Sequence, residues 1–154
     1  MRNLALSLMV VFVALSVAGC AATTSQSVPI PDQSRIIENP QMGRIYVIRP
    51  SAFGGFDSIS MWIRDDNEYI GTTGGSGFLC WERPPGKTEI SGIAKNISSV
   101  TLDVKAGEVY YIHQDIYGPG GPRWYSLVYN KLEVIIPEKA KELMKKCKHP
   151  VFRK

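Results

Sequence analysis

Three cysteines and two histidines are the side chains of this 154-residue chain most able to do covalent chemistry: Cys20, Cys80, Cys147, His113 and His149. A thiol beside an imidazole can act as a nucleophile with its general base, so Cys80 with His113 is a candidate pair for an envelope hydrolase or thiol enzyme. The residues around Cys80, Gly-Phe-Leu-Cys-Trp, do not match a cysteine-hydrolase signature. We therefore expect that the protein is not an enzyme, and keep the Cys80/His113 pair as the alternative.

A metal or phosphate site has little support in the sequence. Zinc needs three or four Cys, His or carboxylate ligands, and His113, Asp115 and Glu108 could offer two on one strand face at best. The run Gly71–Gly77 has the composition of a phosphate-binding loop, but it lacks the Gly-Lys-Ser/Thr ending and no predicted helix follows it. We interpret that run as a flexible hairpin or β-bulge loop, and we expect neither a metal nor a cofactor.

Cys20 follows a segment of a different kind. The chain begins Met-Arg-Asn, and its apolar run from Leu4 to Val17 is interrupted only by two serines. A cationic start, a short apolar run and small residues before a cleavage site are typical of a secretory signal peptide. The run is also shorter than the ~20 residues that a membrane-spanning helix needs.

The segment Val17-Ala18-Gly19-Cys20 resembles the lipobox of bacterial lipoproteins. The resemblance implies cleavage between Gly19 and Cys20 and a diacylglyceryl group, with palmitate-like chains, on the Cys20 thiol. Each buried acyl CH₂ contributes about 0.8 kcal/mol, and two or three chains give stable attachment to a lipid bilayer. Ala21 stands where an Asp would favour retention in the inner membrane, so we expect the periplasmic face of the outer membrane, with the inner membrane left open.

Cys80 and Cys147 would then be the remaining thiols in an oxidising compartment. Cys147 falls on the apolar face of a predicted C-terminal helix, and Cys80 alternates with Phe78 and so can face inward. A disulfide between them would pin the helix to the sheet and contribute roughly 4 kcal/mol. Two separate buried thiols are the alternative.

The sequence predicts three parts: a signal peptide at 1–19, a lipidated N-terminus with a flexible tether at 20–41, and one domain at 42–154. The tether is rich in Ser, Thr, Gln and Pro and has no apolar period. About 20 flexible residues have a root-mean-square reach of about 25 Å, so the domain could tumble near the bilayer without touching it.

Short alternating runs separated by turn residues fill most of the domain. Ile59, Met61 and Ile63 alternate with polar residues, as in a half-buried strand, and Pro84-Pro85-Gly86 marks a turn. Runs of this kind recur about every ten residues, which favours an antiparallel β-sandwich. One α-helix is predicted at about 137–148, because Pro137 suits a first helical position and apolar residues recur at helical spacing after it.

The stretch from Gly43 to about Ile116 resembles the bacterial lipoprotein family that carries the domain of unknown function 2846. The matching pieces are Gly43–Pro50, Tyr69-Ile70-Gly71, Pro85-Gly86-Lys87-Thr88 and Ala106–Ile112. The resemblance implies a PEGA-like or Ig-like β-sandwich and no established catalytic residues. It departs from the pattern at Asp65-Asp66-Asn67, where family members often have a single Asp-Gly.

Aromatic residues give the best candidate for a binding surface. Trp62 shares a polar strand face with Ser60 and Arg64, and Trp124 and Tyr125 follow Arg123 after a glycine-rich loop. Exposed aromatics on a sheet can bind a glycan or a protein. The net charge is +4, and no basic run resembles a nucleic-acid footprint. We therefore expect a membrane-anchored, non-catalytic binding or scaffolding module for an envelope protein or glycan, and no nucleic-acid partner.

Overall fold

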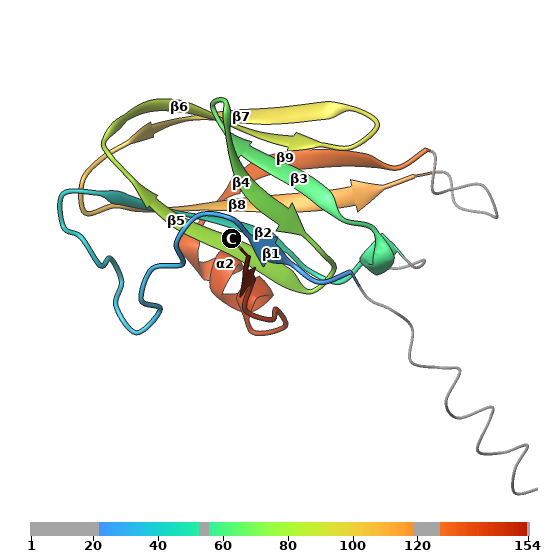
Figure 1. Ribbon diagram of the computed structural model, residues 1–154, viewed down its shortest axis with the longest axis horizontal. Coiled ribbons are helices and arrows are strands. Elements are labelled where there is room, and N and C mark those ends of the chain that lie inside the picture. Colours follow the sequence, from blue (N-terminus) through green and yellow to red (C-terminus); the bar gives the residue numbers. More distant parts are fainter. Residues whose placement is uncertain (1–21, 53–55, 119–126, 154) are drawn as a thin grey trace, which may run out of the picture.

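Two β-sheets packed face to face form the body of the protein, and one helix covers the outer face of the smaller sheet (Figure 1). This computed structural model describes residues 22–52, 56–118 and 127–153. The larger sheet has the strand order β10-β1-β4-β3-β6-β7 and the smaller sheet β5-β2-β8-β9. The elements are β1 (Ser25–Gln26), β2 (Gly43–Arg49), the 3₁₀ helix η1 (Phe56–Ser58), β3 (Met61–Asp65), β4 (Glu68–Thr73), β5 (Gly77–Arg83), β6 (Gly86–Ile93), β7 (Ile97–Val104), β8 (Val109–Tyr117), β9 (Tyr129–Ile135), α2 (Pro137–Met144) and β10 (Val151–Phe152).

The predicted mainly-β sandwich with one C-terminal helix is confirmed, but its sheets are mixed and not purely antiparallel. Strand β2 pairs with β8 in parallel, and β1 pairs with β10 in parallel. Some antiparallel pairs join consecutive strands through a local turn, such as β3 with β4 around Asp66, whose φ is 51°. Others, such as β2 with β5, join strands far apart along the chain. No local turn residue signals a pairing between strands as distant along the chain as β2 and β8.

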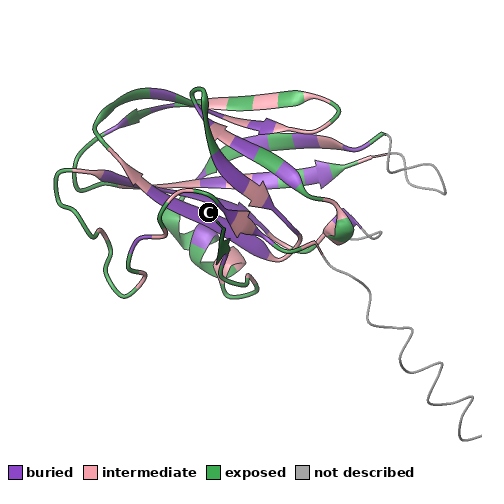
Figure 2. Ribbon diagram, in the orientation of Figure 1, coloured by how far each residue is buried: buried purple, intermediate pink, exposed green. Residues whose placement is uncertain are grey.

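Strand β2 is buried along its whole length because both of its faces are covered (Figure 2). Ile45 and Val47 face the core between the two sheets, whereas Tyr46 and Ile48 face the cluster under α2. The core between the sheets consists of Ile45, Val47, Ile63, Ile70, Leu79, Trp81, Ile90, Leu102, Val104, Ile112 and Leu132. A strand buried on both faces reads as a continuous apolar run.

Helix α2 is shorter than the predicted 137–148. It begins at Pro137 as expected but ends at Met144. Pro150 cannot continue a helix and restricts the residue before it, and the chain has already turned back to the sandwich at Lys148, whose N–H donates to the carbonyl of Ser76 at 2.6 Å. The chain beyond that point adds β10 to the edge of the larger sheet.

The flexible tether predicted at residues 20–41 is corrected by the structure, because the described residues 22–41 are attached to the sandwich by hydrogen bonds. β1 is hydrogen-bonded between β10 and β4, and Gln26 is fully buried. The Gln26 amide accepts from the backbone N–H of Cys80 at 2.9 Å and donates to its carbonyl at 2.6 Å, so it occupies the open edge of β5. The composition predicted a tether because the segment has no apolar period. Its contacts with the sandwich are made by polar side chains and by the backbone, which an apolar period does not report.

Glycines give this N-terminal segment room to approach. A Cβ at Gly71 would lie 2.3 Å from the carbonyl oxygen of Ser25, and one at Gly74 would lie 1.8 Å from that of Ala22. Gly71 belongs to β4 and Gly77 to β5, so the run predicted to be a flexible hairpin or β-bulge loop lies partly within these two strands. Its glycines serve the close approach of a neighbouring backbone.

Candidate functional site

The structure does not bring Cys80 and His113 together. Strand β2 lies between their strands, and its Tyr46 pairs with Cys80 on one side and Tyr111 on the other. Two strand spacings are roughly 10 Å, well beyond hydrogen-bond reach. Burial also raises the pKa of the Cys80 thiol and lowers the pKa of His113. A buried thiol held in its neutral form is a poor nucleophile.

The two remaining cysteines are separate thiols in the structure, which is the alternative that the sequence left open. Both pack in the cluster between the smaller sheet and α2. Cys80 accepts a weak hydrogen bond from Gln33 at 3.5 Å, whereas Cys147 lies 3.4 Å from the carbonyl of Leu143. Burial raises the pKa of Cys147 to about 11, so this thiol too is neutral at physiological pH.

No group of three or more Cys, His, Asp or Glu side chains suited to a metal ion occurs within residues 22–52, 56–118 and 127–153. His149, the other histidine, contacts the Phe78 ring edge-on at a centroid distance of 5.3 Å. The described histidines therefore have ordinary packing surroundings.

Trp62, by contrast, stands on the open face of the larger sheet. Its neighbours Met61 and Ile63 point into the protein, while Trp62 is 53% exposed. It pairs with Ile93 of β6, and Ile93 pairs with Ile97 of β7, which is 72% exposed. These three residues form a cross-strand apolar line on the solvent side of the sheet, which we name the Trp62 row.

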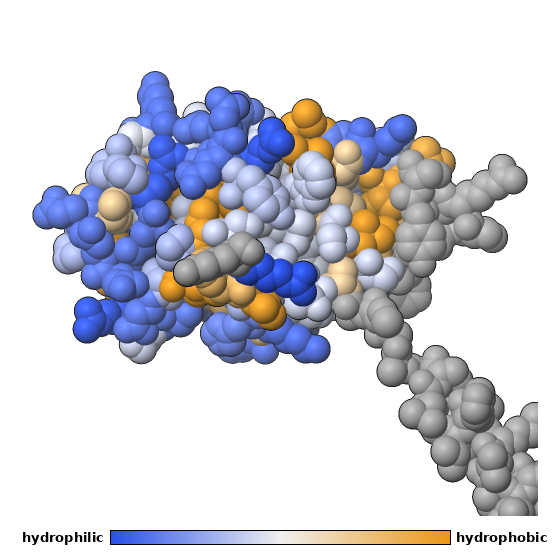
Figure 3. All heavy atoms as spheres, viewed as in Figure 1, coloured by the Kyte–Doolittle hydropathy of each residue, from blue (hydrophilic) through white to orange (hydrophobic). Residues whose placement is uncertain are grey.

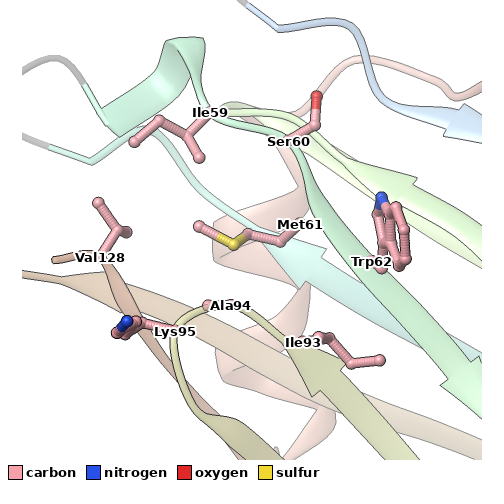
Figure 4. A pocket seen from close by; sticks show the side chains of 8 residues that line it. All are labelled: Ile59, Ser60, Met61, Trp62, Ile93, Ala94, Lys95 and Val128. Carbon is pink, nitrogen blue, oxygen red and sulfur yellow. The ribbon is translucent and has the colours of Figure 1, made fainter. Parts of the chain in front are cut away.

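A cavity of about 400 Å³ opens beside this row, and we name it the Trp62 groove (Figure 4). It is lined by Ile59, Ser60, Met61, Trp62, Ile93, Ala94, Lys95 and Val128. Met61 lies between Val128 and Trp62, and its side chain forms part of the apolar cluster beneath. Lys95 is the one charged residue in the lining, and it is exposed.

A fully buried arginine fixes one wall of the groove. The guanidinium of Arg49 donates to the carbonyl of Ile59 at 2.6 Å, of Thr73 at 2.8 Å and of Phe56 at 2.6 Å. Burial lowers the pKa of Arg49 to about 10, which keeps it charged at neutral pH. Sequence analysis missed this positioning residue, although an arginine ending an apolar strand is a usable signal.

A second cavity of about 430 Å³ has both apolar and charged residues in its walls. We name it the Asp65 pocket, and Val28, Pro29, Ile30, Pro31, Glu38, Asp65, Glu68, Ile70, Trp81, Glu82, Arg83 and Pro84 line it. Trp81 donates to the Asp65 carboxylate at 2.8 Å, and Arg83 and Thr88 also bond to it. Glu82 is bound by Arg44 at 2.8 Å. The central charges of this pocket are thus used within the protein.

Several predicted site residues lie outside the described residues: Gly19, Cys20, Arg123, Trp124 and Tyr125. Trp62 is therefore the member of the predicted binding surface that the structure places. In the part of the chain that is described, no helix has the length and apolar character needed to cross a membrane.

No protein-family model, curated protein or solved structure matches this chain. The resemblance to the domain of unknown function 2846 family stays a prediction.

Proposed function

We propose that the protein is a bacterial envelope lipoprotein, anchored through a lipid on Cys20, whose sandwich is a non-catalytic binding or scaffolding module. The anchor rests on the lipobox-like segment that ends at Cys20 and the apolar run before it. The periplasmic face of the outer membrane is the proposed location. An envelope component, whether lipid, protein or glycan, is the proposed partner.

The Trp62 row and groove carry the binding part of this proposal. Cross-strand pairing holds three apolar side chains in a line that faces solvent. Exposing apolar surface to water is unfavourable, so these side chains gain from being covered by a partner. Contiguous exposed apolar surface on a rigid element is typical of an interaction site. Arg49 adds rigidity, because it ties η1 and Ile59 to β4.

The alternative, a thiol enzyme, has weaker support. An active site needs ionisable groups that converge in an accessible pocket. Cys80 is 0% exposed and lies two strands away from His113. The described cavities contain neither residue in their lining.

Crosslinking in cells tests the binding surface. A photo-crosslinking amino acid is placed at Ile97 and, in a matched control, at Asp103, because both are exposed on the same face of β7. We expect specific capture of an envelope component from position 97 and little from position 103. Equal capture at both positions, or none at position 97, would remove the support for the groove.

Membrane fractionation tests the anchor. We expect Cys20→Ser to leave the precursor uncleaved or to release the protein from membranes, whereas Cys80→Ser leaves processing unchanged. Unchanged cleavage and membrane attachment of the Cys20→Ser protein would contradict the lipoprotein proposal.

A further inference from the structure

Resting on the proposed function, we propose that the bilayer holding the Cys20 lipid is itself the partner of the Trp62 groove. The sandwich would then lie on the membrane surface through the end that carries η1. The occupant of the Trp62 groove is then a lipid surface, whereas the proposed function allows any envelope component.

The first observation is the short distance between the anchor and the folded domain. The backbone N–H of Ala22 donates to the carbonyl of Asp57 at 3.0 Å, and Gly75 donates to the same carbonyl at 3.3 Å. Cys20 precedes Ala22 by two residues. A fully extended chain spans at most about 3.6 Å per residue, so the Cα atom of Cys20 lies within about 7 Å of that of Ala22. This is far less than the ~25 Å reach of a 20-residue flexible tether.

The second observation is that the anchor leaves the domain beside the groove. Asp57, which holds Ala22, belongs to η1, and Ile59 two residues later lines the groove. The N–H of Ile59 donates to the carbonyl of Phe56 at 3.1 Å, so η1 and the groove wall form one unit. A lipid on Cys20 therefore brings the bilayer to the edge of the groove.

The third observation is the chemistry of this end of the sandwich. Besides the Trp62 row, Tyr117 is 49% and Leu127 is 41% exposed. Both lie near η1, since a Cβ on Gly118 would be 2.8 Å from the carbonyl oxygen of Leu127 and 3.6 Å from the Phe56 ring. In Figure 3, apolar residues are visible toward this end, while hydrophilic residues predominate at the opposite end.

These residue types suit the boundary between lipid headgroups and acyl chains. Trp and Tyr side chains are enriched at that boundary because one part is apolar and another donates hydrogen bonds. The exposed Lys95 at the groove can approach an anionic headgroup. A protein partner would have to share this end with the bilayer, which makes the lipid surface the better-supported occupant.

Fluorescence quenching by brominated lipids tests the docking. The full mature lipoprotein, carrying Trp124→Phe so that Trp62 and Trp81 are its two remaining tryptophans, is reconstituted into phosphatidylethanolamine/phosphatidylglycerol vesicles whose acyl chains carry bromine near the headgroup. We expect quenching of tryptophan emission, and we expect Trp62→Phe to remove a clear share of it. Trp81, which is 3% exposed, serves as the internal unquenched reference. Equal quenching in the wild type and in Trp62→Phe would overturn the proposal.

A matched pair of variants and one backbone variant sharpen the test. Ile97→Ser should weaken the quenching of Trp62, whereas Asp103→Ser on the same strand face should leave it unchanged. Gly74→Ala places a Cβ where the Ala22 carbonyl lies, so it should free the N-terminal residues, lengthen the tether and reduce quenching while the protein stays anchored. Circular dichroism shows whether each variant is folded. If Gly74→Ala does not fold, the effect of Ile97→Ser on the quenching of Trp62 decides whether the groove contacts the bilayer.

The outcomes separate this inference from the proposed function. If Cys20→Ser remains processed and attached, the lipoprotein proposal fails and the docking proposal fails with it. If the wild type is anchored, Trp62 is unquenched and position 97 captures an envelope protein, the docking proposal alone is overturned. Quenching of Trp62 that Ile97→Ser weakens supports both.

Discussion

Strand β2 carries a fully buried arginine near each of its ends, and the two differ in what surrounds them. Arg44 forms a 2.8 Å ion pair with Glu82 and donates to the carbonyls of Asp32 and Arg35. Arg49 instead donates to the backbone carbonyls of Ile59, Thr73 and Phe56, around η1. One arginine fastens the N-terminal segment to the sandwich, and the other shapes the wall of the Trp62 groove.

The protein surfaces near these two arginines also differ, in how their charged and apolar residues are used. Near Arg44, two carboxylates of the Asp65 pocket are satisfied within the fold, because Asp65 is bound by Trp81 and Arg83 and Glu82 is bound by Arg44. Near Arg49, the Trp62 row presents apolar side chains to solvent, with Trp62 53% and Ile97 72% exposed. The end that carries Arg49 is therefore the better candidate for a binding surface, because Asp65 and Glu82 at the other end are each bound by an arginine.

The largest expected effect on stability is at the Arg44 end. Arg44→Met leaves the Glu82 carboxylate without its cation and frees the carbonyls of Asp32 and Arg35. Removing one partner of a buried pair costs roughly 3–5 kcal/mol of unfolding free energy, which urea denaturation measures. The double variant Arg44→Met/Glu82→Leu should recover part of the loss. A loss below about 1 kcal/mol in the single variant would mean that the pair does not hold this end.

Arg49→Met should cost somewhat less, about 3 kcal/mol, because it leaves buried carbonyls without donors but no buried counter-charge. It should also loosen η1 and raise hydrogen exchange at the Ile59 N–H. Arg49→Lys, which keeps the charge with fewer aligned donors, is the matched control. Its stability and its exchange at Ile59 should lie between those of the wild type and of Arg49→Met. Exchange at Ile59 that is the same in all three proteins would show that Arg49 does not shape the groove.

Gln26→Glu tests the packed N-terminal segment, with an expected cost of about 2 kcal/mol. A carboxylate cannot donate to the Cys80 carbonyl, which the Gln26 amide now meets at 2.6 Å. Hydrogen exchange should increase at the Cys80 N–H and in residues 25–28 and remain unchanged in β6. If the backbone amides of residues 25–28 already exchange freely in the wild type, this segment is a flexible tether, as its composition predicts.

A smaller effect is expected on lowering the pH, and it should arise at the Arg44 end. Desolvation acts to raise the pKa of Glu82, but hydrogen bonds from the N–H groups of Glu38 and Asn39 and from Arg44 outweigh it, and the net pKa is lowered. A carboxyl with a lowered folded-state pKa stabilises the protein above its ordinary value of 4.5. That stability is lost as the pH falls through the folded-state pKa.

The measurement is the thermal midpoint between pH 6 and pH 2.5, for the wild type and Glu82→Gln. Glu82→Gln should be less stable at pH 6 and should show a shallower decline with acid. Parallel curves would show that Glu82 does not supply this pH dependence.

The smallest expected effect on stability is that of Trp62→Ser, within about 0.5 kcal/mol, because exposed surface positions rarely carry folding energy. Its expected effect on membrane docking is nevertheless large. A stability loss of several kcal/mol would instead make Trp62 a packing residue and remove the contrast between the two ends.

The sequence was informative where the physics is local. Alternation around Met61 and the turn at Pro84 predicted strands that the structure contains, and Pro137 correctly began the helix. It was uninformative for pairings between distant segments, such as β1 with β4, which depend on Gln26 reaching β5 and on glycines at 71 and 74. Buried Arg44 and Arg49 were missed for the same reason, since their partners lie elsewhere in the chain.

The site was predicted only in part. Trp62 was correctly placed on an outward strand face, yet its apolar neighbours Ile93 and Ile97 come from strands whose register no local pattern gives. The relation between the anchor and the groove was also hidden, because it depends on the hydrogen bond from Ala22 to Asp57.

Membrane docking of the Trp62 groove can be tested by comparing how deeply two positions on β7 are immersed in the bilayer. Nitroxide labels are attached at Ile97→Cys and at Asp103→Cys, in the Cys147→Ala background, of the lipidated protein in phosphatidylethanolamine/phosphatidylglycerol vesicles. Paramagnetic relaxation by oxygen and by a water-soluble nickel chelate reports on each label. We expect the label at 97 to be accessible to oxygen and shielded from nickel, and the label at 103 to be fully accessible to nickel. Equal nickel accessibility at both positions would show that the sandwich does not touch the membrane, and would overturn the docking proposal.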